Sequence, residues 1–384
     1  MNKSLGQYFT THEVLLEKVY QLIKNNPQHI LEPSVGRGHI VDYIQRKIKN
    51  CNFKMIEIDK SLNMLSSINK NNLIYNDFLN CEINETFDTV IGNPPFVKKK
   101  GGNLYIRFID KCIDLLNEKG ELIFIIPSDF FKVTSASKTL HKMMDNGYFS
   151  HIFHPHDEHL FKHASIDVLV FRYVKSTQKQ TRLIYNNETK YVHFNDGIIN
   201  FENSSKENIL LLKNYFDVYV GMVSGCDSIL KNQTFGNELL LVEKDKQEKY
   251  IFVNNINEIK DELKDYLYLH KNKLIQRKVR KIDESNWFEF GLPRNKKNID
   301  LLKGKSAIFI HNISRKDQVA FKSIVQYFSG NLIMIVPKEK YEKKINLDKY
   351  VDYFNSDEFK NKYMYSNRFK ITHKNMMNSI LPDL

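Results

Sequence analysis

The chain has 384 residues, more than a typical domain of roughly 100 to 200 residues, so two domains are expected. No apolar run approaches the roughly 18 residues that cross a bilayer, and the N-terminus lacks the apolar core of a signal peptide, so we expect a cytoplasmic protein without a membrane partner. An excess of 57 Lys and Arg over 45 Asp and Glu gives a net charge of +12. This charge suits a polyanionic partner such as nucleic acid, although an AT-rich genome can produce the same Lys-rich composition.

Four cysteines lie far apart without a CxxC pair: Cys51, Cys81, Cys112 and Cys226. This spacing argues against a structural zinc site and against a disulfide framework. We expect reduced thiols.

Short apolar runs alternate with helical stretches from residue 28 onwards, which is typical of a sheet covered by helices. The predicted strands are 29–31, 53–58, 73–75, 87–91, 121–126, 151–153 and 168–174. The predicted helical stretches are one that follows the first strand and ends at about residue 50, one near 62–68, and one at 104–117. This pattern predicts an α/β fold with a Rossmann-like, doubly wound, seven-stranded sheet.

The regular alternation stops after residue 175, and short strand-like runs, aromatic residues and basic clusters follow. We place the transition between residues 176 and 215. The predicted domains are a catalytic domain at 1–180 and a C-terminal α+β domain at 181–384.

A short glycine turn follows the first predicted strand in the segment 30–38. Gly36 and Gly38 lack side chains and allow a ligand to approach the backbone, and Glu32 offers a carboxylate to a cationic amine. The turn has two glycines, one fewer than the G-x-G-x-x-G motif that binds the pyrophosphate of a dinucleotide. It therefore favours a compact nucleoside as the ligand. Taken alone, it is more often just a tight turn.

Two further strands end in acidic residues. Glu57 stands 19 positions after Gly38, close to the offset at which an acid holds ribose hydroxyls. Asp77 and Phe78 follow the third strand, where a carboxylate accepts from an adenine amino group and a ring covers its face. Asp77 could equally cap the next segment.

The most specific feature directly follows the fourth strand: Asn93, Pro94, Pro95 and Phe96. The prolines fix φ and have no N–H, so this rigid segment offers mainly acceptors. The Asn93 side-chain oxygen and the Pro94 carbonyl can accept both hydrogens of an exocyclic amino group, which directs the nitrogen lone pair at a methyl sulfonium. Positioning and polarisation need neither a metal nor a covalent intermediate.

Phe96 offers a ring on which a substrate base can stack. A base inside a duplex cannot reach a buried methyl donor, so the target nucleotide is expected to flip out. The alternative is a plain turn after the strand.

The segments 6–10 (GQYFT), 32–38, 57–58, 77–78 and 93–96, in this order, resemble the motifs of the γ group of DNA amino-methyltransferases, to which TaqI-like adenine-N6 enzymes belong. Residues 115–128 also resemble the fifth-strand region of that group. Phe96 departs from the commoner tyrosine, and Arg37 and His39 are unusual beside the glycine turn. The resemblance covers nearly the whole chain.

The resemblance implies that S-adenosylmethionine is the cofactor and that N6 of adenine in duplex DNA is methylated. It implies a C-terminal target-recognition domain, a monomer, and a possible cognate restriction endonuclease as a separate protein. The cofactor-binding residues that it implies are Tyr8, Phe9, Thr10, Glu32, Ser34, Gly36, Gly38, Glu57, Ile58, Asp77 and Phe78.

Three lysines follow the tetrapeptide after one intervening residue: Lys98, Lys99 and Lys100. They are predicted to meet DNA phosphates, which would make binding salt-dependent but not sequence-dependent. A solvated loop is the alternative.

Residues 220–225 resemble the start of the family's target-recognition domain, and Met222 is the candidate for a second wall around the flipped base. The segments 274–281 and 287–295 interleave basic and aromatic residues, as a surface that crosses a DNA groove would. Arg277, Arg280 and Arg294 are the candidate DNA contacts, although Arg294 could also be a plain surface charge.

Five histidines invite a metal-site interpretation: His151, His154, His156, His159 and His163. Their spacing crosses a strand, a proline turn and a following segment, and the proposed chemistry needs no cation, so no metal is expected. The sequence also lacks a convincing set of carboxylates and lysine that would form a nuclease active site.

The sequence leaves several other functions open. RNA adenine-N6, cytosine-N4 and protein glutamine methylation can use a similar tetrapeptide, although the long C-terminal region argues against RNA and protein substrates. A non-enzymatic DNA-binding module with a relic pocket is a further alternative.

Overall fold

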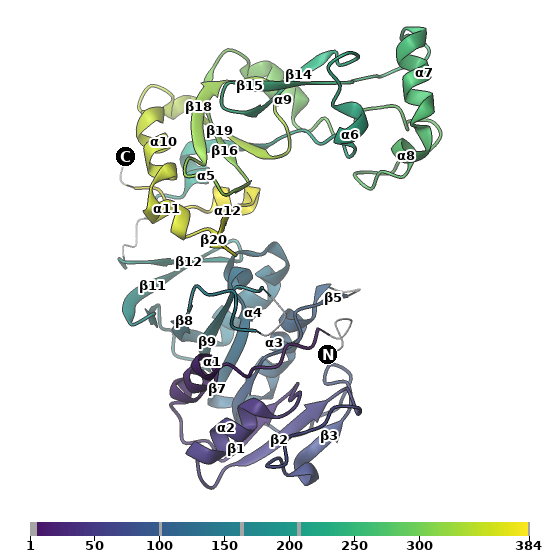
Figure 1. Cartoon of the computed structure of the whole chain (residues 1–384). Helices are drawn as coiled ribbons and strands as arrows, with labels where there is room; N and C mark the ends of the chain where they lie inside the picture. The colour runs from purple at the N-terminus through teal and green to yellow at the C-terminus, as the bar shows by residue number, and fades with distance from the viewer. Residues whose placement is uncertain (1–5, 100–101, 162–164, 206–208, 383–384) are drawn as a thin grey trace. The chain divides into compact units, whose positions relative to one another are not determined.

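A mixed sheet of ten strands organises the described part of residues 1–208, the first of two units into which the chain divides (Figure 1). The computed structural model describes residues 6–99, 102–161, 165–205 and 209–382. The strand order is β12-β11-β10-β8-β9-β7-β4-β1-β2-β3. The strands are β1 His29–Glu32, β2 Asn52–Glu57, β3 Leu73–Tyr75, β4 Phe87–Gly92, β7 Leu116–Pro127, β8 Gly147–Phe153, β9 Val168–Lys175, β10 Arg182–Tyr185, β11 Glu188–Asn195 and β12 Ile198–Glu202.

The strand order reverses at β1, which pairs in parallel with β2 on one side and β4 on the other. Leu31 is opposite Lys54 of β2 and Val90 of β4. The carboxyl ends of β1, β2 and β4 therefore meet at one edge, which is where open α/β sheets bind ligands.

Helices cover both faces of this sheet. They are α1 Glu13–Leu22, α2 His39–Lys47, α3 Leu104–Leu115 and α4 Ser137–Asn146. Successive side chains of β7 alternate between two cores: Leu122 and Phe124 pack with α3 and α4, whereas Ile123 packs with α1 and α2. Because side chains alternate along a strand, an uninterrupted apolar run such as that of β7 is buried on both faces.

The seven predicted strands all occur in the sheet, but the sheet is larger than predicted. In the described residues, β10 to β12 extend it by pairing β10 in parallel with β8. The chain consequently divides at residues 208/209, which lies within the expected transition at 176–215 but after the domain boundary of 180/181. The strands beyond β9 continue the first sheet because their buried residues, such as Leu183 and Val192, join its core.

The predicted helix at 62–68 is wrong, because this segment forms turns. The Leu65 amide donates to the Arg37 carbonyl instead of to a carbonyl one helical turn earlier. Ile68 packs against the glycine turn, where a Cβ on Gly38 would lie 2.5 Å from its Cγ1. Tertiary packing therefore determines the conformation of this segment. The sequence analysis also missed α1 and α4.

The second unit, residues 209–384, is built around a sheet with the order β13-β19-β16-β18. These strands are β13 Phe216–Val220, β16 Ser306–His311, β18 Ala320–Ile324 and β19 Leu332–Pro337. Two small sheets accompany it: a two-stranded sheet of β14 Glu238–Glu243 and β15 Lys246–Tyr250, and a three-stranded sheet with the order β17 Ile313–Ser314, β21 Arg368–Lys370 and β20 Met364–Tyr365.

The helices of the second unit are short. They are α5 Leu212–Tyr215, α6 Asp227–Leu230, α7 Asp261–Leu269, α8 Lys271–Ile275, α9 Lys296–Leu302, α10 Leu347–Asn355, α11 Asp357–Asn361 and α12 His373–Met377. One core packs α10 to α12 on the sheet, and a separate small core around Trp287 joins α6, α7 and α8. The unit is therefore an α+β structure.

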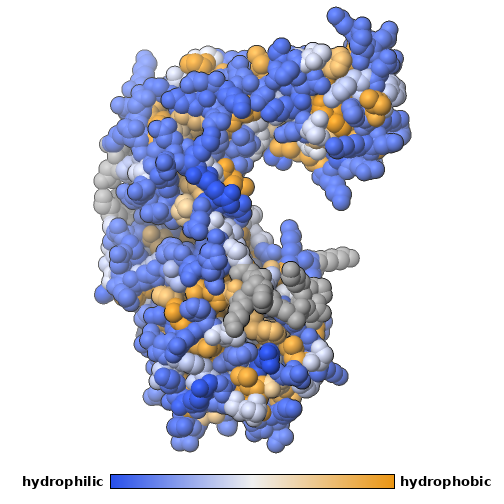
Figure 2. All heavy atoms as spheres, viewed as in Figure 1, coloured by the Kyte–Doolittle hydropathy of each residue, from blue (hydrophilic) through white to orange (hydrophobic). Residues whose placement is uncertain are grey.

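The visible surface is mainly hydrophilic, and apolar side chains form small separate patches (Figure 2). Among the described residues, no helix has both the length and the apolar composition to span a bilayer.

Candidate active site

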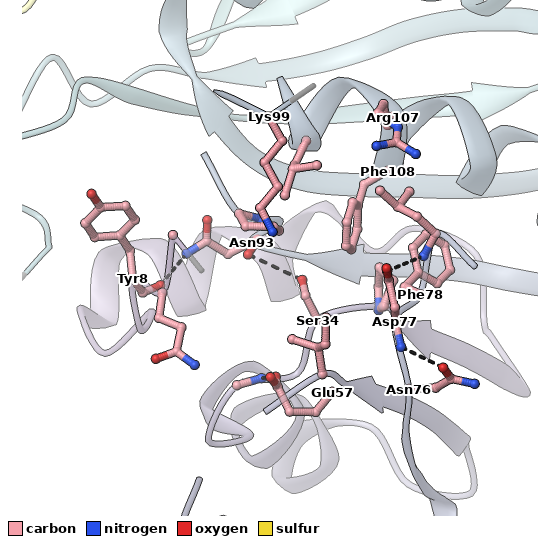
Figure 3. A pocket seen from close by; sticks show the side chains of 18 of the residues that line it. Tyr8, Ser34, Glu57, Asn76, Asp77, Phe78, Asn93, Lys99, Arg107 and Phe108 are labelled. Carbon is pink, nitrogen blue, oxygen red and sulfur yellow. Dashed lines mark hydrogen bonds between the residues drawn. The ribbon is translucent and has the colours of Figure 1, made fainter. Parts of the chain in front are cut away.

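An open pocket lies where β1, β2, β3 and β4 end, and its empty volume is about 910 Å³, partly open to solvent (Figure 3). Ten of the predicted cofactor and catalytic residues line it: Tyr8, Phe9, Ser34, Gly36, Glu57, Ile58, Asp77, Phe78, Asn93 and Pro95. Each strand ends at the same edge, so residues far apart in sequence converge here.

Asn93 has its amide group fixed in one orientation. Its Nδ2 donates to the Tyr8 carbonyl at 2.8 Å (Figure 3). It also donates to Thr10 Oγ1 at 3.0 Å. Both bonds use the amide nitrogen, so Oδ1 is left as an acceptor, and it is buried without a hydrogen-bond partner. A buried acceptor without a partner costs roughly 1 to 3 kcal/mol, which a donor from a ligand would recover.

The glycine turn after β1 approaches the N-terminal segment closely. Gly36 has φ +58°, and a Cβ at this position would lie 3.2 Å from Cδ1 of Phe9. Ser34 Oγ donates to the Asn93 carbonyl at 3.4 Å. The turn, the N-terminal segment and the tetrapeptide therefore form one connected wall.

Glu57 binds two backbone amides of this wall through its carboxylate. Its carboxylate accepts from the Gly36 amide at 2.8 Å and from the Asp59 amide at 2.9 Å. Burial raises the pKa of Glu57, while the two amides act in the opposite direction. Each carboxylate oxygen keeps a further lone pair for a hydroxyl donor from a ligand.

Asp77 performs the capping role that the sequence left open. Its carboxylate accepts from the Leu79 amide at 3.0 Å and from Asn80 Nδ2 at 2.7 Å. It also lines the pocket, so the capping role and ligand contact are compatible.

Apolar side chains border the same end of the pocket. Phe78 is only 2% exposed and packs on Phe108, with ring centroids 4.9 Å apart. In contrast, Ile58 is 50% exposed although it lines the pocket. An apolar side chain exposed inside a pocket provides a surface for a flat ligand ring.

Phe96 does not line this pocket but joins an aromatic cluster beside it. Its ring stacks on Tyr8 at 6.2 Å with an interplanar angle of 23°, and it meets Tyr105 and Phe161 edge-on. Pro94 is buried and is also outside the pocket wall. The cluster therefore lies next to Asn93 on the side of Tyr8.

Several lining residues were missed by the sequence analysis. Arg107 and Phe108 come from the first turns of α3, and Arg107 is exposed (Figure 3). Leu104 also lines the pocket, and the spacing of 104, 107 and 108 places all three on one helical face. This spacing was a usable signal, whereas the contact of Phe161 with Phe96 depends on tertiary structure alone.

Three predicted cofactor residues are not in the wall. Thr10 instead orients Asn93 through its hydroxyl. Gly38 has φ +90° and packs against Ile68 at the start of α2. Glu32 is 1% exposed, and its Oε2 is buried without a hydrogen-bond partner.

Glu32 predicts a pH dependence of stability. Burial, and to a lesser extent Glu57, raise the pKa of Glu32 well above its usual value. A raised pKa in the folded state means that stability is highest below the unfolded pKa near 4.3 and falls as the pH rises toward the folded value. We expect Glu32→Gln to flatten the fall in thermal midpoint between pH 5 and pH 8, measured by calorimetry without ligand. An equal fall in the thermal midpoint of the wild type and of Glu32→Gln would contradict this role of Glu32.

The lysines after the tetrapeptide differ in position. Lys99 lines the pocket and points toward Asn93, whereas Lys98 is exposed outside the wall (Figure 3). Lys100 lies outside the described residues.

Two predicted DNA contacts in the second unit are wrong for structural reasons. Met222 is 1% exposed and lies in a hydrophobic core, so it cannot form the wall of an open base pocket. Arg277 is 6% exposed, and its guanidinium donates at 2.7 to 2.9 Å to four carbonyls, those of Leu274, Ser224, Trp287 and Glu289. Arg280 pairs with Glu289, and Arg294 is exposed.

Arg277 should be important for stability. Arg277→Met leaves buried carbonyls without donors, so we expect a loss of roughly 3 kcal/mol in the free energy of unfolding, measured with urea. Lys278→Met, a change of its exposed neighbour, should stay within about 0.5 kcal/mol of the wild type. Similar losses in both variants would contradict the anchoring role.

The histidine segment forms a hydrogen-bond network instead of a ligand cluster. His154 Nε2 lies 2.7 Å from Asp167 Oδ1, and its Nδ1 lies 3.1 Å from the Tyr185 hydroxyl. Ser128 donates to the same carboxylate. In the part of the chain that the structure describes, which excludes His163, no group of three or more His, Cys, Asp or Glu is arranged to hold a metal.

Comparison with known proteins adds independent information. The family model of the Eco57I restriction-modification methylase matches residues 13–161. The Type II methyltransferase M.HincII of Haemophilus influenzae is 28% identical over 209 residues, covering 49% of this chain and 40% of the relative. The modification methylase CviBIII of Paramecium bursaria Chlorella virus NC1A is 33% identical over 148 residues, covering 33% of this chain and 39% of the relative.

The chain thus spans about 40% of the length of these curated relatives. Among solved structures, the Type IIL restriction-modification enzyme MmeI, determined in complex with DNA, is similar over 96% of this chain and 64% of that chain, with a TM-score of 0.56 and 10% identity. This likeness confirms the fold class, an α/β sheet followed by a further C-terminal region.

Proposed function

We propose that this chain is an S-adenosylmethionine-dependent DNA methyltransferase that methylates N6 of a flipped-out adenine. The observation that carries the proposal is Asn93 Oδ1, a buried acceptor without a partner at the end of β4. The family match over residues 13–161 supports it, because that range contains most of the pocket and the whole tetrapeptide.

The oxygen suits an amino group because an exocyclic nitrogen is a weak nucleophile. Its lone pair is delocalised into the ring, and a fixed acceptor that binds an N–H favours a tetrahedral nitrogen with an available lone pair. Asn93 does not need to reorient when the substrate binds, because Tyr8 and Thr10 already hold its Nδ2. A preorganised group in a water-excluded site is the arrangement that contributes most to transition-state stabilisation.

The pocket residues fit the cofactor. When bound, S-adenosylmethionine supplies an electrophilic methyl group on a sulfonium. Glu57 offers lone pairs to ribose hydroxyls, Asp77 offers a carboxylate to the adenine amino group, and Ile58 and Phe78 border the place of the adenine ring. Gly36 leaves room for the ligand beside Phe9, since a Cβ there would already crowd that ring.

The aromatic cluster fits a flat substrate. Phe96, Tyr8 and Phe161 lie within 6.4 Å of one another, measured between ring centroids, and they adjoin Asn93. Asn93 Oδ1 is shielded from solvent, so entry of a base requires neighbouring side chains to move. Stacking of about 1 to 3 kcal/mol per base would help to offset this cost.

Duplex DNA is the proposed partner. The net charge of +12 and the exposed lysines Lys98 and Lys99 beside the site favour a polyanion. A separate cognate endonuclease and a monomeric state remain predictions, as does a cytoplasmic location.

The test is the transfer of tritiated methyl groups to three acceptors in parallel: duplex DNA, RNA and total protein. We expect label in duplex DNA at specific sites and none in RNA or protein. Label in RNA or protein alone would overturn the proposal. The absence of both methyl transfer and saturable cofactor binding would also overturn it, because that result would indicate a relic pocket.

A further inference from the structure

The turn at residues 77–81 carries Asp77 and Phe78 to the pocket from the edge of the first sheet. It follows β3, which has three residues and stands last in the described sheet, beside β2. The side chains of Ile74 and Tyr75 on this strand are each 37% exposed. The residues of the turn belong to neither a helix nor a strand. The sheet therefore supports this part of the pocket less than it supports the ends of β1, β2 and β4.

Hydrogen bonds inside the turn determine its shape. The Asp77 carbonyl accepts from the Asn80 amide at 3.0 Å and from the Cys81 amide at 2.8 Å. The Asp77 carboxylate accepts from the Leu79 amide at 3.0 Å. All three bonds join residues of the turn to each other, so they do not attach the turn to its surroundings.

Lys111 of α3 attaches the turn to a helix. Its Nζ donates to the Phe78 carbonyl at 2.6 Å and also to the Cys81 carbonyl. The same ammonium group lies 4.8 Å from the centroid of the Phe78 ring. Hydrogen bonds from a charged donor are roughly twice as strong as those between neutral groups. One side chain therefore binds the backbone at both ends of 78–81 and contacts the ring between them and the pocket.

Lys111 continues the face of α3 that borders the pocket. Leu104, Arg107 and Phe108 line the pocket, and Lys111 follows three residues after Phe108 on the same helical face. Phe108 packs on Phe78 (Figure 3). Lys111 is not in the pocket wall. It therefore acts on a bound ligand through the turn and not by direct contact.

We propose that Lys111 is a positioning residue for the cofactor. Its ammonium group fixes the turn 77–81, so that the Asp77 carboxylate accepts from the adenine amino group of S-adenosylmethionine and Phe78 borders the adenine ring. Lys111 thereby contributes to the preference of the site for adenine over a base that lacks the amino group. This inference rests on the proposed function and adds a residue to its cofactor site.

Lys175 provides a matched control on the same helix. Its Nζ donates to the carbonyls of Ile113 and Leu116 at 3.1 and 2.7 Å, at the C-terminal end of α3. Lys175 is partly buried, as Lys111 is, and it also lies outside the pocket wall. Replacement of either lysine by methionine removes an ammonium group and two hydrogen bonds to carbonyls. Only those of Lys111 belong to the turn that carries Asp77.

The test is calorimetric titration of the full-length protein with S-adenosylhomocysteine, which binds without methyl transfer. We expect Lys111→Met to weaken the affinity by on the order of tenfold, because it removes two charge-assisted hydrogen bonds from the turn. Lys175→Met should keep an affinity near that of the wild type. If Lys111→Met does not fold, Lys111→Gln removes the charge with a polar side chain and should weaken the affinity in the same direction.

A second ligand tests the adenine end of the pocket specifically. S-inosylhomocysteine carries an oxygen in place of the adenine amino group. The wild type should prefer S-adenosylhomocysteine, because Asp77 accepts from the amino group. Lys111→Met should reduce this preference, whereas Lys175→Met should keep it. A general loss of stability would leave the ratio of the two affinities unchanged.

Three results would overturn the inference: unchanged affinity and preference in Lys111→Met, equal losses in Lys111→Met and Lys175→Met, or a wild type that binds both ligands equally. The titrations need no methyl transfer, so their failure is separate from a failure of the proposed function. A wild type that prefers S-adenosylhomocysteine but labels no DNA would contradict the proposed methylation and would leave the role of Lys111 intact.

Discussion

Replacement of Asn93 by alanine should reduce the rate of methyl transfer at saturating substrates by on the order of 100-fold to 1,000-fold. The variant removes the buried acceptor and also the amide that bonds to Tyr8 and Thr10. Single-turnover rates with labelled cofactor measure the effect on chemistry. Cofactor affinity should change much less, because Asn93 is one of many pocket residues.

A second variant distinguishes the role of the Asn93 oxygen from that of the hydrogen bonds that orient the Asn93 amide. Thr10→Val keeps Oδ1 but removes one of the two bonds that orient the amide, so an intermediate loss of rate is expected. An Asn93→Ala variant that turned over at the wild-type rate would contradict the role of this oxygen. A larger loss in Thr10→Val than in Asn93→Ala would also contradict it.

Glu57→Gln should weaken cofactor binding by roughly 10-fold to 100-fold, because hydrogen bonds to a charged group contribute about 1.5 to 3 kcal/mol. A glutamine keeps one acceptor oxygen but places an NH2 group against either the Gly36 or the Asp59 amide. Calorimetric titration with S-adenosylmethionine measures the affinity. The rate at saturating cofactor should remain near that of the wild type, since Glu57 does not contact Asn93.

Glu82→Gln is a suitable control, since Glu82 is also acidic but lies outside the pocket wall. Unchanged cofactor affinity in Glu57→Gln, with the thermal midpoint also unchanged, would argue against its role in the pocket. An equal loss of affinity in both variants would indicate a general electrostatic effect instead.

The sequence predicted the strands well where burial alone determines them. The run of β7 is apolar on both faces, and such runs are visible without tertiary information. Residues at strand ends were also predictable, because parallel strands of a doubly wound sheet bring their carboxyl ends together. Asn93, Glu57 and Asp77 met in one pocket for this reason.

Features that depend on contacts between distant segments were not predictable. The segment 62–68 has apolar spacing compatible with a helix, yet Ile68 packs against Gly38 and the segment forms turns. Likewise, Phe161 reaches Phe96 only through the folding of a segment that follows β8.

Charge in a sequence does not reveal what the charged group faces. Arg277 lies in a basic stretch that resembled a DNA-binding surface, yet its guanidinium is bonded to backbone carbonyls. Arg294 is exposed and lies just before α9. Burial and hydrogen-bond geometry distinguish these two arginines, and neither can be read from composition.

The central claim is that the pocket presents an acceptor to an exocyclic amino nitrogen. The most direct measurement is mass spectrometry of nucleosides from duplex DNA incubated with the wild-type protein and isotopically labelled S-adenosylmethionine. We predict labelled N6-methyladenine, absent with Asn93→Ala. Labelled 5-methylcytosine would contradict the claim, because a methyl group on a ring carbon requires different chemistry from an amide oxygen that binds an amino hydrogen.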